Sequence, residues 1–233
     1  MSVNKTEPRL DRRTAILDAA EEQFAKHGYD GVTLRAIARR AGVDLALPNY
    51  YFGPKRDLFD AVLFRRAEIL NKARLDQLDQ CLVESDQAPS VEAIIRAYLE
   101  PMLTGEQVEE EGWKNYYALI AYVNNSPEWG GQLMTQFFDP LVYRFMDALR
   151  LALPGVEDRD LYWGYHCLSG ALTLTFAQTG RIDHLSGGSC RSSDLMDACE
   201  HMVQFTTAGF EAFRKQMTAD KKGRPRKGPS ARR

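Results

Sequence analysis

The sequence predicts an all-α protein with a small N-terminal helical unit, a larger helical body and a basic tail. Apolar residues recur at intervals of three and four along nearly the whole chain, and alternating, strand-like patterns are almost absent. Gly or Pro marks many of the ends of these periodic segments. We expect the three parts to cover residues 10–55, 56–217 and 218–233.

Four helices are expected in the first part of the chain and into the body. They cover residues 11–27, 34–41, 44–52 and 55–80. Thr33 and Asp44 are placed to cap the second and third helices, and Gly42 makes the turn between them. Pro48 is the fourth position counted from Asp44, where a proline removes the first intrahelical hydrogen bond, so this helix is expected to be partly 3₁₀ or to begin a residue later.

The body is expected to hold five further helices. Ser90 caps a helix that ends at Leu103, and an acidic stretch leads into a second that ends at Asn124. The other three cover residues 127–154, 158–179 and 194–217. Pro140 is expected to kink or restart the first of these three, and residues 182–193 are expected to form a loop.

Composition excludes several classes of protein. No apolar run is long enough to span a bilayer and the N-terminus is polar, so we expect a cytoplasmic protein that has no membrane segment. The four cysteines form no C-x-x-C pair, and no histidine lies at zinc spacing, which favours buried free thiols over a disulfide or a metal site. No cofactor-binding motif and no catalytic motif is found, so an enzyme is not expected.

The near-zero net charge of −2 hides an uneven distribution. Residues 1–78 carry 14 Lys and Arg against 11 Asp and Glu, residues 79–213 carry 7 against 20, and residues 214–233 carry 9 against 1. Two basic ends therefore flank an acidic body. This pattern indicates that the ends, rather than the body, meet a polyanion.

Residues 34–52 have the proportions of a helix-turn-helix. The helix after Gly42 is short enough to enter a DNA major groove, which is about 12 Å wide. The helix before it would cross the backbone and meet a phosphate at its N-terminus.

The stretch ILDAAEEQFAKHGYDGVTLRAIARRAGVDLALPNYYFGPKRDLFDAVL closely resembles the N-terminal DNA-binding domain of TetR-family transcriptional regulators. The later RRAEILNKARLDQLD resembles a subgroup related to fatty-acid-responsive members. The resemblance implies a three-helix helix-turn-helix domain followed by a C-terminal helical domain for ligand binding and dimerisation. It also implies a homodimer that binds palindromic operator DNA and is released by a small hydrophobic ligand, such as an acyl chain or acyl-CoA.

Carried over residue by residue, the resemblance implies DNA contacts at Thr33, Arg35, Leu45, Ala46, Leu47, Asn49, Tyr50, Tyr51 and Lys55. Apolar side chains at the start of a recognition helix can touch thymine methyl groups, and an asparagine can pair with adenine. The tyrosines, the threonine and the lysine are better suited to phosphates. Some of these nine residues must instead be buried against the neighbouring helices.

The body is rich in aromatic residues, most of which should form core. The resemblance implies a ligand pocket between the middle helices, with Tyr117, Phe137, Tyr143 and His166 as candidate contacts. His166 is equally interpreted as a buried core histidine. The last two helices are expected to form the dimer surface, with Trp163, Gly164, Ser169, Gly170, Ala171, Ala208, Gly209 and Phe210. The same residues could pack within one chain.

An alternative is an architectural DNA-binding protein that has no small ligand. Its support is the tail sequence KKGRPRKGP, which resembles an AT-hook for narrow A·T minor grooves. A solvated basic tail explains the same residues.

Overall fold

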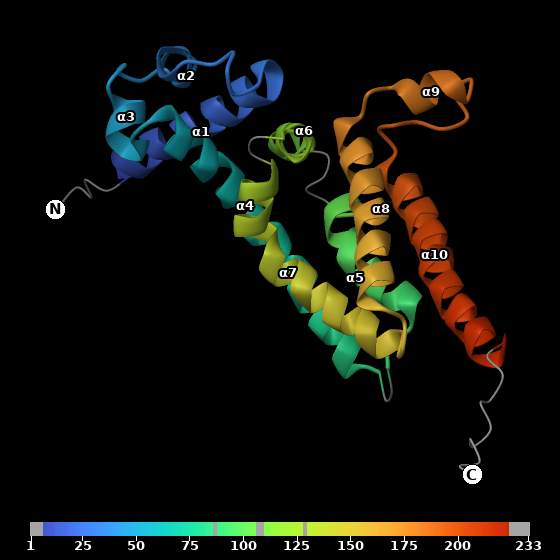
Figure 1. Cartoon of the computed structure of the whole chain (residues 1–233). Helices are drawn as coiled ribbons and strands as arrows, with labels where there is room; N and C mark the ends of the chain where they lie inside the picture. The colour runs from blue at the N-terminus through green and yellow to red at the C-terminus, as the bar shows by residue number, and fades with distance from the viewer. Residues whose placement is uncertain (1–6, 86–87, 106–109, 128–129, 224–233) are drawn as a thin grey trace, which may run out of the picture.

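A computed structural model describes residues 7–85, 88–105, 110–127 and 130–223, and all regular structure within these ranges is helical (Figure 1). The expected all-α class is confirmed. The basic tail from residue 224 onward, with most of the AT-hook-like sequence, lies outside the described residues. Within the described part of the chain, no helix is both long and apolar enough to cross a membrane.

The N-terminal unit consists of α1, α2 and α3, which lie together at one end of the molecule (Figure 1). Their bounds are Glu7–His27, Leu34–Ala41 and Leu47–Phe52. The long helix α4, Lys55–Val83, leaves this unit and runs along the body. Phe24 of α1 meets Phe59 of α4 edge to face, with ring centroids 4.9 Å apart. The N-terminal unit and the body therefore share one apolar core.

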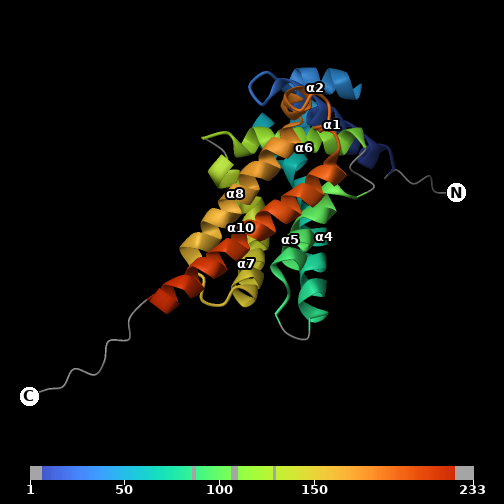
Figure 2. The same cartoon turned by 90° about the vertical axis from the view of Figure 1, so that its right-hand side faces the viewer.

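The body is a bundle of helices packed along α4. The other helices of the body are α5 Val91–Leu103, α6 Glu111–Asn124, α7 Gly130–Ala152, α8 Asp158–Ala177, α9 Arg181–Leu185 and α10 Leu195–Gly223. α5 packs against α4 on one side and α10 on the other, and α6 packs against both α1 and α8. Figure 2 shows α8 and α10 side by side along the outer side of the molecule.

Pro140 lies within α7, which continues through it, so of the expected kink or restart the restart does not occur. Two other details of the body differ from expectation. The expected loop at 182–193 overlaps the short helix α9. The last helix continues to Gly223, beyond the expected boundary at residue 217. By contrast, Ser90 caps α5 as expected, because its hydroxyl oxygen accepts a hydrogen bond from the amide of Ala93 at 3.1 Å.

The expectation of buried thiols is wrong for most of the cysteines. Only Cys199 is buried, whereas Cys167 is exposed and Cys81 and Cys190 are partly buried. Burial raises the pKa of the Cys199 thiol to about 11, so this cysteine stays protonated at neutral pH. Among the described residues, no cluster of His, Cys, Asp and Glu has the geometry of a metal site.

Candidate nucleic-acid interface and internal cavity

The turn between α2 and α3 is fixed by local hydrogen bonds. Thr33 lies in extended backbone before α2, and its Oγ1 accepts a hydrogen bond from the amide of Ala36 at 3.1 Å. Gly42 has a φ of +66°, a left-handed conformation that residues with a Cβ rarely adopt. Its amide donates to the carbonyl of Arg39. These contacts satisfy both ends of α2 and set the direction in which the chain enters α3.

α3 begins at Leu47, later than the predicted start at Asp44. The Asp44 carboxylate accepts a hydrogen bond from the amide of Ala46 at 2.9 Å, and so stabilises a turn that precedes the helix. Pro48 becomes the second helical residue and is buried. Amides in the first helical turn have no intrahelical acceptor, so the expected loss of a hydrogen bond at Pro48 is wrong.

The structure divides the nine predicted DNA-contact residues into two groups. The exposed ones are Thr33, Arg35, Leu45, Ala46, Asn49 and Tyr50. The partly buried ones are Leu47, Tyr51 and Lys55, of which Leu47 and Tyr51 pack against the core. Tyr50 is 66% exposed although Tyr51, its neighbour, is not. We call Leu45, Ala46, Asn49 and Tyr50 the α3 edge. A continuous apolar and aromatic edge of this kind is typical of a binding surface.

Lys55 has a structural task at the start of α4. Its Nζ donates to the carbonyls of Tyr29 at 2.9 Å and Val32 at 3.0 Å. The ammonium also lies 4.0 Å from the centroid of the Tyr29 ring. Lys55 thereby ties α4 to the turn between α1 and α2, and two of its three donors are used inside the protein. Its assignment as a phosphate contact stays a prediction.

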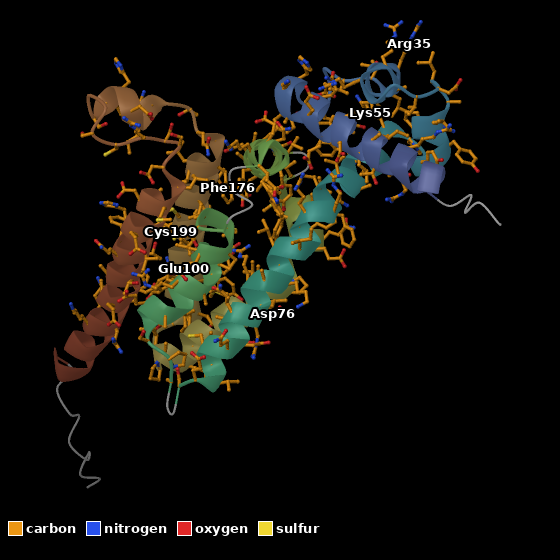
Figure 3. The ribbon with its side chains drawn as sticks, turned by 180° about the vertical axis from the view of Figure 1, so that it is seen from behind. Arg35, Lys55, Asp76, Glu100, Phe176 and Cys199 are labelled. Carbon is orange, nitrogen blue, oxygen red and sulfur yellow. The ribbon has the colours of Figure 1, made fainter. Side chains whose placement is uncertain are left out.

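Positive charge beside the α3 edge comes from α2. Arg35 points away from the body of the molecule (Figure 3), and Arg39 is also exposed. Among the described residues, neither forms an ion pair. Arg40 differs, because it pairs with Glu22 at 2.7 Å. Hydrogen bonds from Lys26 and Arg40 lower the pKa of Glu22 below its usual value. Arg39, which the family motif did not single out, is thus a candidate phosphate contact.

The body encloses a cavity of about 40 Å³ between α4, α5, α6, α7 and α8. Its aromatic walls are Tyr98, Tyr116, Tyr117, Phe138, Tyr165 and Phe176. The rings of Tyr117 and Phe176 stack with centroids 4.4 Å apart. Burial raises the pKa of the Tyr116, Tyr117 and Tyr165 hydroxyls, so all three remain neutral phenols.

One of the four predicted ligand contacts, Tyr117, lies in the wall of this cavity. Phe137 packs instead against Phe64 of α4, with ring centroids 5.7 Å apart. Tyr143 is 55% exposed on α7. His166 is exposed, not buried as one interpretation required, because α8 turns a different face toward the core. It lies in a separate surface hollow, which shares Asn124, Ser169 and Thr173 with the cavity.

A buried charge network joins the N-terminal unit to the cavity region. Glu21 of α1 is 2% exposed and accepts hydrogen bonds from Arg65 at 2.8 Å and Arg66 at 2.7 Å. The guanidinium of Arg66 lies 4.7 Å from the ring of Trp113 in α6. A Cβ added at Gly112 would lie 2.0 Å from Arg66 Nη2, so a larger residue at this position would displace the Arg66 guanidinium from the network. α1, α4 and α6 are therefore locked together at one junction.

The predicted dimer residues on α8 and α10 also divide into two groups. Phe210 is buried against Gly164, where an added Cβ would lie 2.5 Å from the phenyl ring. Ser169 is partly buried and lines the cavity. The others are exposed: Trp163, Gly170, Ala171, Ala208 and Gly209. Two further exposed apolar residues, Leu174 of α8 and Phe205 of α10, accompany them. We call these seven exposed residues the α8/α10 face.

Two family models match the chain along most of its length. The model for bacterial regulatory proteins of the tetR family matches residues 16–62, and the one for the tetracyclin repressor-like C-terminal domain matches residues 96–209. The chain belongs to the TetR family. Members of this family are transcriptional regulators and not enzymes, and the first match runs from within α1 through α2 and α3 into the start of α4.

Relatives within the TetR family are similar to parts of the chain. The HTH-type transcriptional regulator BetI of Agrobacterium fabrum is 33% identical over 107 residues, which is 46% of this chain and 50% of that protein. The regulatory protein RaaS of Mycobacterium tuberculosis is 32% identical over 133 residues, 57% of this chain and 53% of that protein. The chain thus spans about half the length of these curated relatives.

Solved structures extend the similarity to the whole TetR fold. A putative regulator from Saccharomonospora viridis, solved in complex with choline, is 22% identical to this chain. The match covers 85% of this chain and 95% of that one, with a TM-score of 0.54. At this level of identity, the comparison establishes the shared fold.

Proposed function

We propose that this chain is a ligand-responsive transcriptional repressor that binds palindromic operator DNA as a homodimer. The observation that carries the proposal is the α3 edge, an exposed row of apolar, amide and phenol side chains on a well-packed three-helix unit. α3 is six residues long, which corresponds to about 9 Å of helix. An element of this size fits within a major groove about 12 Å wide.

Each exposed side chain suits a particular part of DNA. Leu45 and Ala46 would touch thymine methyl groups, and the Asn49 amide would pair with adenine N6 and N7. Tyr50 on α3, and Arg35 and Arg39 on α2, would contact phosphates. Thr33 has its hydroxyl oxygen engaged as a cap, yet that hydroxyl still has a proton to donate to a phosphate. The α3 edge would determine which DNA sequence the protein prefers. The phosphate contacts of α2 would fix the position of the protein on the duplex.

We infer that the dimer forms through α8 and α10. The α8/α10 face exposes large apolar side chains, and Gly170 and Gly209 leave open space beside the helices, where a Cβ would meet no atom within 4 Å. Small residues let two helices approach closely, while residues such as Trp163 fill the gaps. A two-fold axis through this face would present two α3 edges to two half-sites of one operator.

The ligand would release the protein from DNA through a movement of α4. This helix begins at Lys55, which is tied to the N-terminal unit, and passes the cavity at Leu70 and Arg74. The Glu21 network adds a second rigid link between the same regions. A ligand that enlarges the cavity would shift α4 and thereby the separation of the two α3 edges. Operator and ligand would then weaken each other's binding by the same factor.

The proposed ligand is small and hydrophobic, and the acyl chain suggested by the sequence remains one option. Choline, the ligand in the Saccharomonospora viridis structure, carries a positive charge. A cation is disfavoured here because the buried guanidinium of Arg74 already lines the cavity.

Tyr50→Ala tests the DNA-contact assignment. We expect it to weaken binding to a duplex selected by the wild-type protein about tenfold or more, because one phosphate contact per half-site is lost. The melting temperature should not change, since Tyr50 is mostly exposed. Fluorescence anisotropy with labelled duplex measures the affinity.

Tyr143→Ala is the matched control, because Tyr143 is similarly exposed but lies on α7. It should leave DNA affinity unchanged. Equal affinities for the Tyr50 variant and the wild type would refute the assignment of the α3 edge.

A further inference from the structure

Arg74 of α4 is a buried cation without a buried anion. It is 2% exposed and lines the cavity. Its Nε donates to the carbonyl of Tyr98 at 3.0 Å, and its guanidinium carbon lies 3.7 Å from the centroid of the Tyr98 ring. Its Nη2 is buried and has no hydrogen-bond partner in the part of the chain that the structure describes. Among the described residues, no carboxylate pairs with it.

This arrangement leaves a full positive charge inadequately compensated. A carbonyl and the face of an aromatic ring stabilise a guanidinium, but neither neutralises it. None of the described residues that line the cavity is Asp or Glu, and burial raises the pKa of three of its four tyrosines, Tyr116, Tyr117 and Tyr165, so these three phenols are neutral. Buried charges in proteins are normally paired, so the missing negative charge is expected from outside the chain.

Tyr116 supplies a second unused donor in the same cavity. Its side chain is buried, and its hydroxyl has no hydrogen-bond partner among the residues that the structure describes. Tyr117 differs, because its hydroxyl donates to the carbonyl of Met102 at 2.7 Å. Since burial raises the pKa of Tyr116, its hydroxyl keeps its proton and can donate it in a hydrogen bond.

We propose that Arg74 and Tyr116 bind the carboxylate of a small organic acid whose apolar body packs among the cavity's aromatic walls. A carboxylate accepts the hydrogen bonds that Arg74 Nη2 and the Tyr116 hydroxyl leave unmade, and it neutralises the buried charge. Leu70, Ile120, Phe138, Leu172 and Phe176 supply apolar wall. The proposal rests on the ligand-responsive function proposed above and names the chemical class of the ligand.

The size of the cavity indicates that binding is coupled to movement. A volume of about 40 Å³ admits a few water molecules and is far below the roughly 300 Å³ of an ordinary ligand site. An organic acid must therefore displace wall residues, of which Met134 of α7 is unbranched and only partly buried. Because Arg74 belongs to α4, the acid would act directly on the helix that carries the N-terminal unit.

The test uses the purified full-length protein without DNA and measures thermal unfolding. The probes are butanoate, octanoate and phenylacetate, each compared with its primary amide, together with octylamine and inorganic phosphate. We expect at least one acid, at a hundredfold excess over its Kd, to raise the melting temperature by roughly 5 to 10 °C. The matched amide, the amine and phosphate should each leave it nearly unchanged.

Two variants test whether the acid stabilises the protein by binding at Arg74 and Tyr116. Arg74→Met keeps much of the side-chain volume and removes the unpaired charge, so we expect it to fold and to lose the response to the acid. Tyr116→Phe removes only the hydroxyl and should weaken acid binding about tenfold. The proposal is overturned if no acid stabilises the wild type, if amides stabilise as well as acids, if phosphate alone reproduces the shift, or if Arg74→Met responds like the wild type.

The test for acid binding does not depend on whether the protein binds DNA. A protein that binds the acid but selects no operator would contradict the proposed function and leave this inference intact. A protein that binds an operator but discriminates no acid from its amide would contradict this inference alone.

Discussion

Glu21→Gln should be strongly destabilising, lowering the free energy of unfolding by about 3 kcal/mol. The substitution leaves Arg65 and Arg66 without the buried carboxylate that now accepts their hydrogen bonds. Breaking a buried ion pair by removing one partner costs about 3 to 5 kcal/mol. The lower end applies because the side chains of Arg65 and Arg66 are 23% and 15% exposed and gain some hydration.

Urea unfolding followed by circular dichroism measures this loss. Asp79→Asn is the control, since Asp79 joins α4 to α7 through Arg144 but both side chains are largely exposed. It should cost less than about 1 kcal/mol. Similar losses in the two variants would mean that the Glu21 network is no more than a surface ion pair and does not hold α1, α4 and α6 together.

Phe205→Asp should separate the proposed dimer while leaving the fold of each chain intact. Phe205 is 82% exposed, so its replacement disturbs little within one chain. It lies one helical turn after His201, which lines a surface groove together with Leu174 of α8. A large aromatic residue at the centre of an interface contributes about 2 kcal/mol or more, and the substitution is present in both protomers, so the dimer dissociation constant should rise by about thirtyfold or more.

Sedimentation equilibrium over a range of protein concentrations measures that constant. Leu151→Asp serves as the matched control, because Leu151 is also an exposed apolar residue but lies on α7. It should remain as dimeric as the wild type. An unchanged dissociation constant for the Phe205 variant would exclude the α8/α10 face as the dimer interface.

The helix boundaries that the sequence predicts well are those with a local chemical signal. Thr33, Gly42 and Ser90 each act through hydrogen bonds or backbone angles within a few residues, so their roles are visible in the sequence. The start of α3 is harder to predict, because the Asp44 carboxylate bonds an amide in the same way whether a helix or a turn follows. Pro48 is compatible with the first turn of a helix, so its position favours a helix that begins at Leu47 over one that begins at Asp44.

The cavity could be predicted only in part. The structure places Tyr117, one of the ligand contacts proposed from the sequence, in the cavity wall, and its contact with a ligand stays a prediction. Arg74 was missed because an arginine on a helix rich in charged residues normally faces water, and only the packing of α5 over α4 shows that it is buried. The interpretation of His166 as a buried core histidine is wrong, since its helix turns Leu161, Leu168 and Leu172 toward the core instead.

Selection of bound DNA from random duplexes by the full-length protein tests the central claim most directly. We predict a palindrome with half-sites about one helical turn apart, roughly 34 to 36 Å, because a two-fold dimer presents two α3 edges to one face of the duplex. Enrichment of A·T-rich DNA without a palindrome would contradict this account and favour an architectural protein that binds through its basic tail.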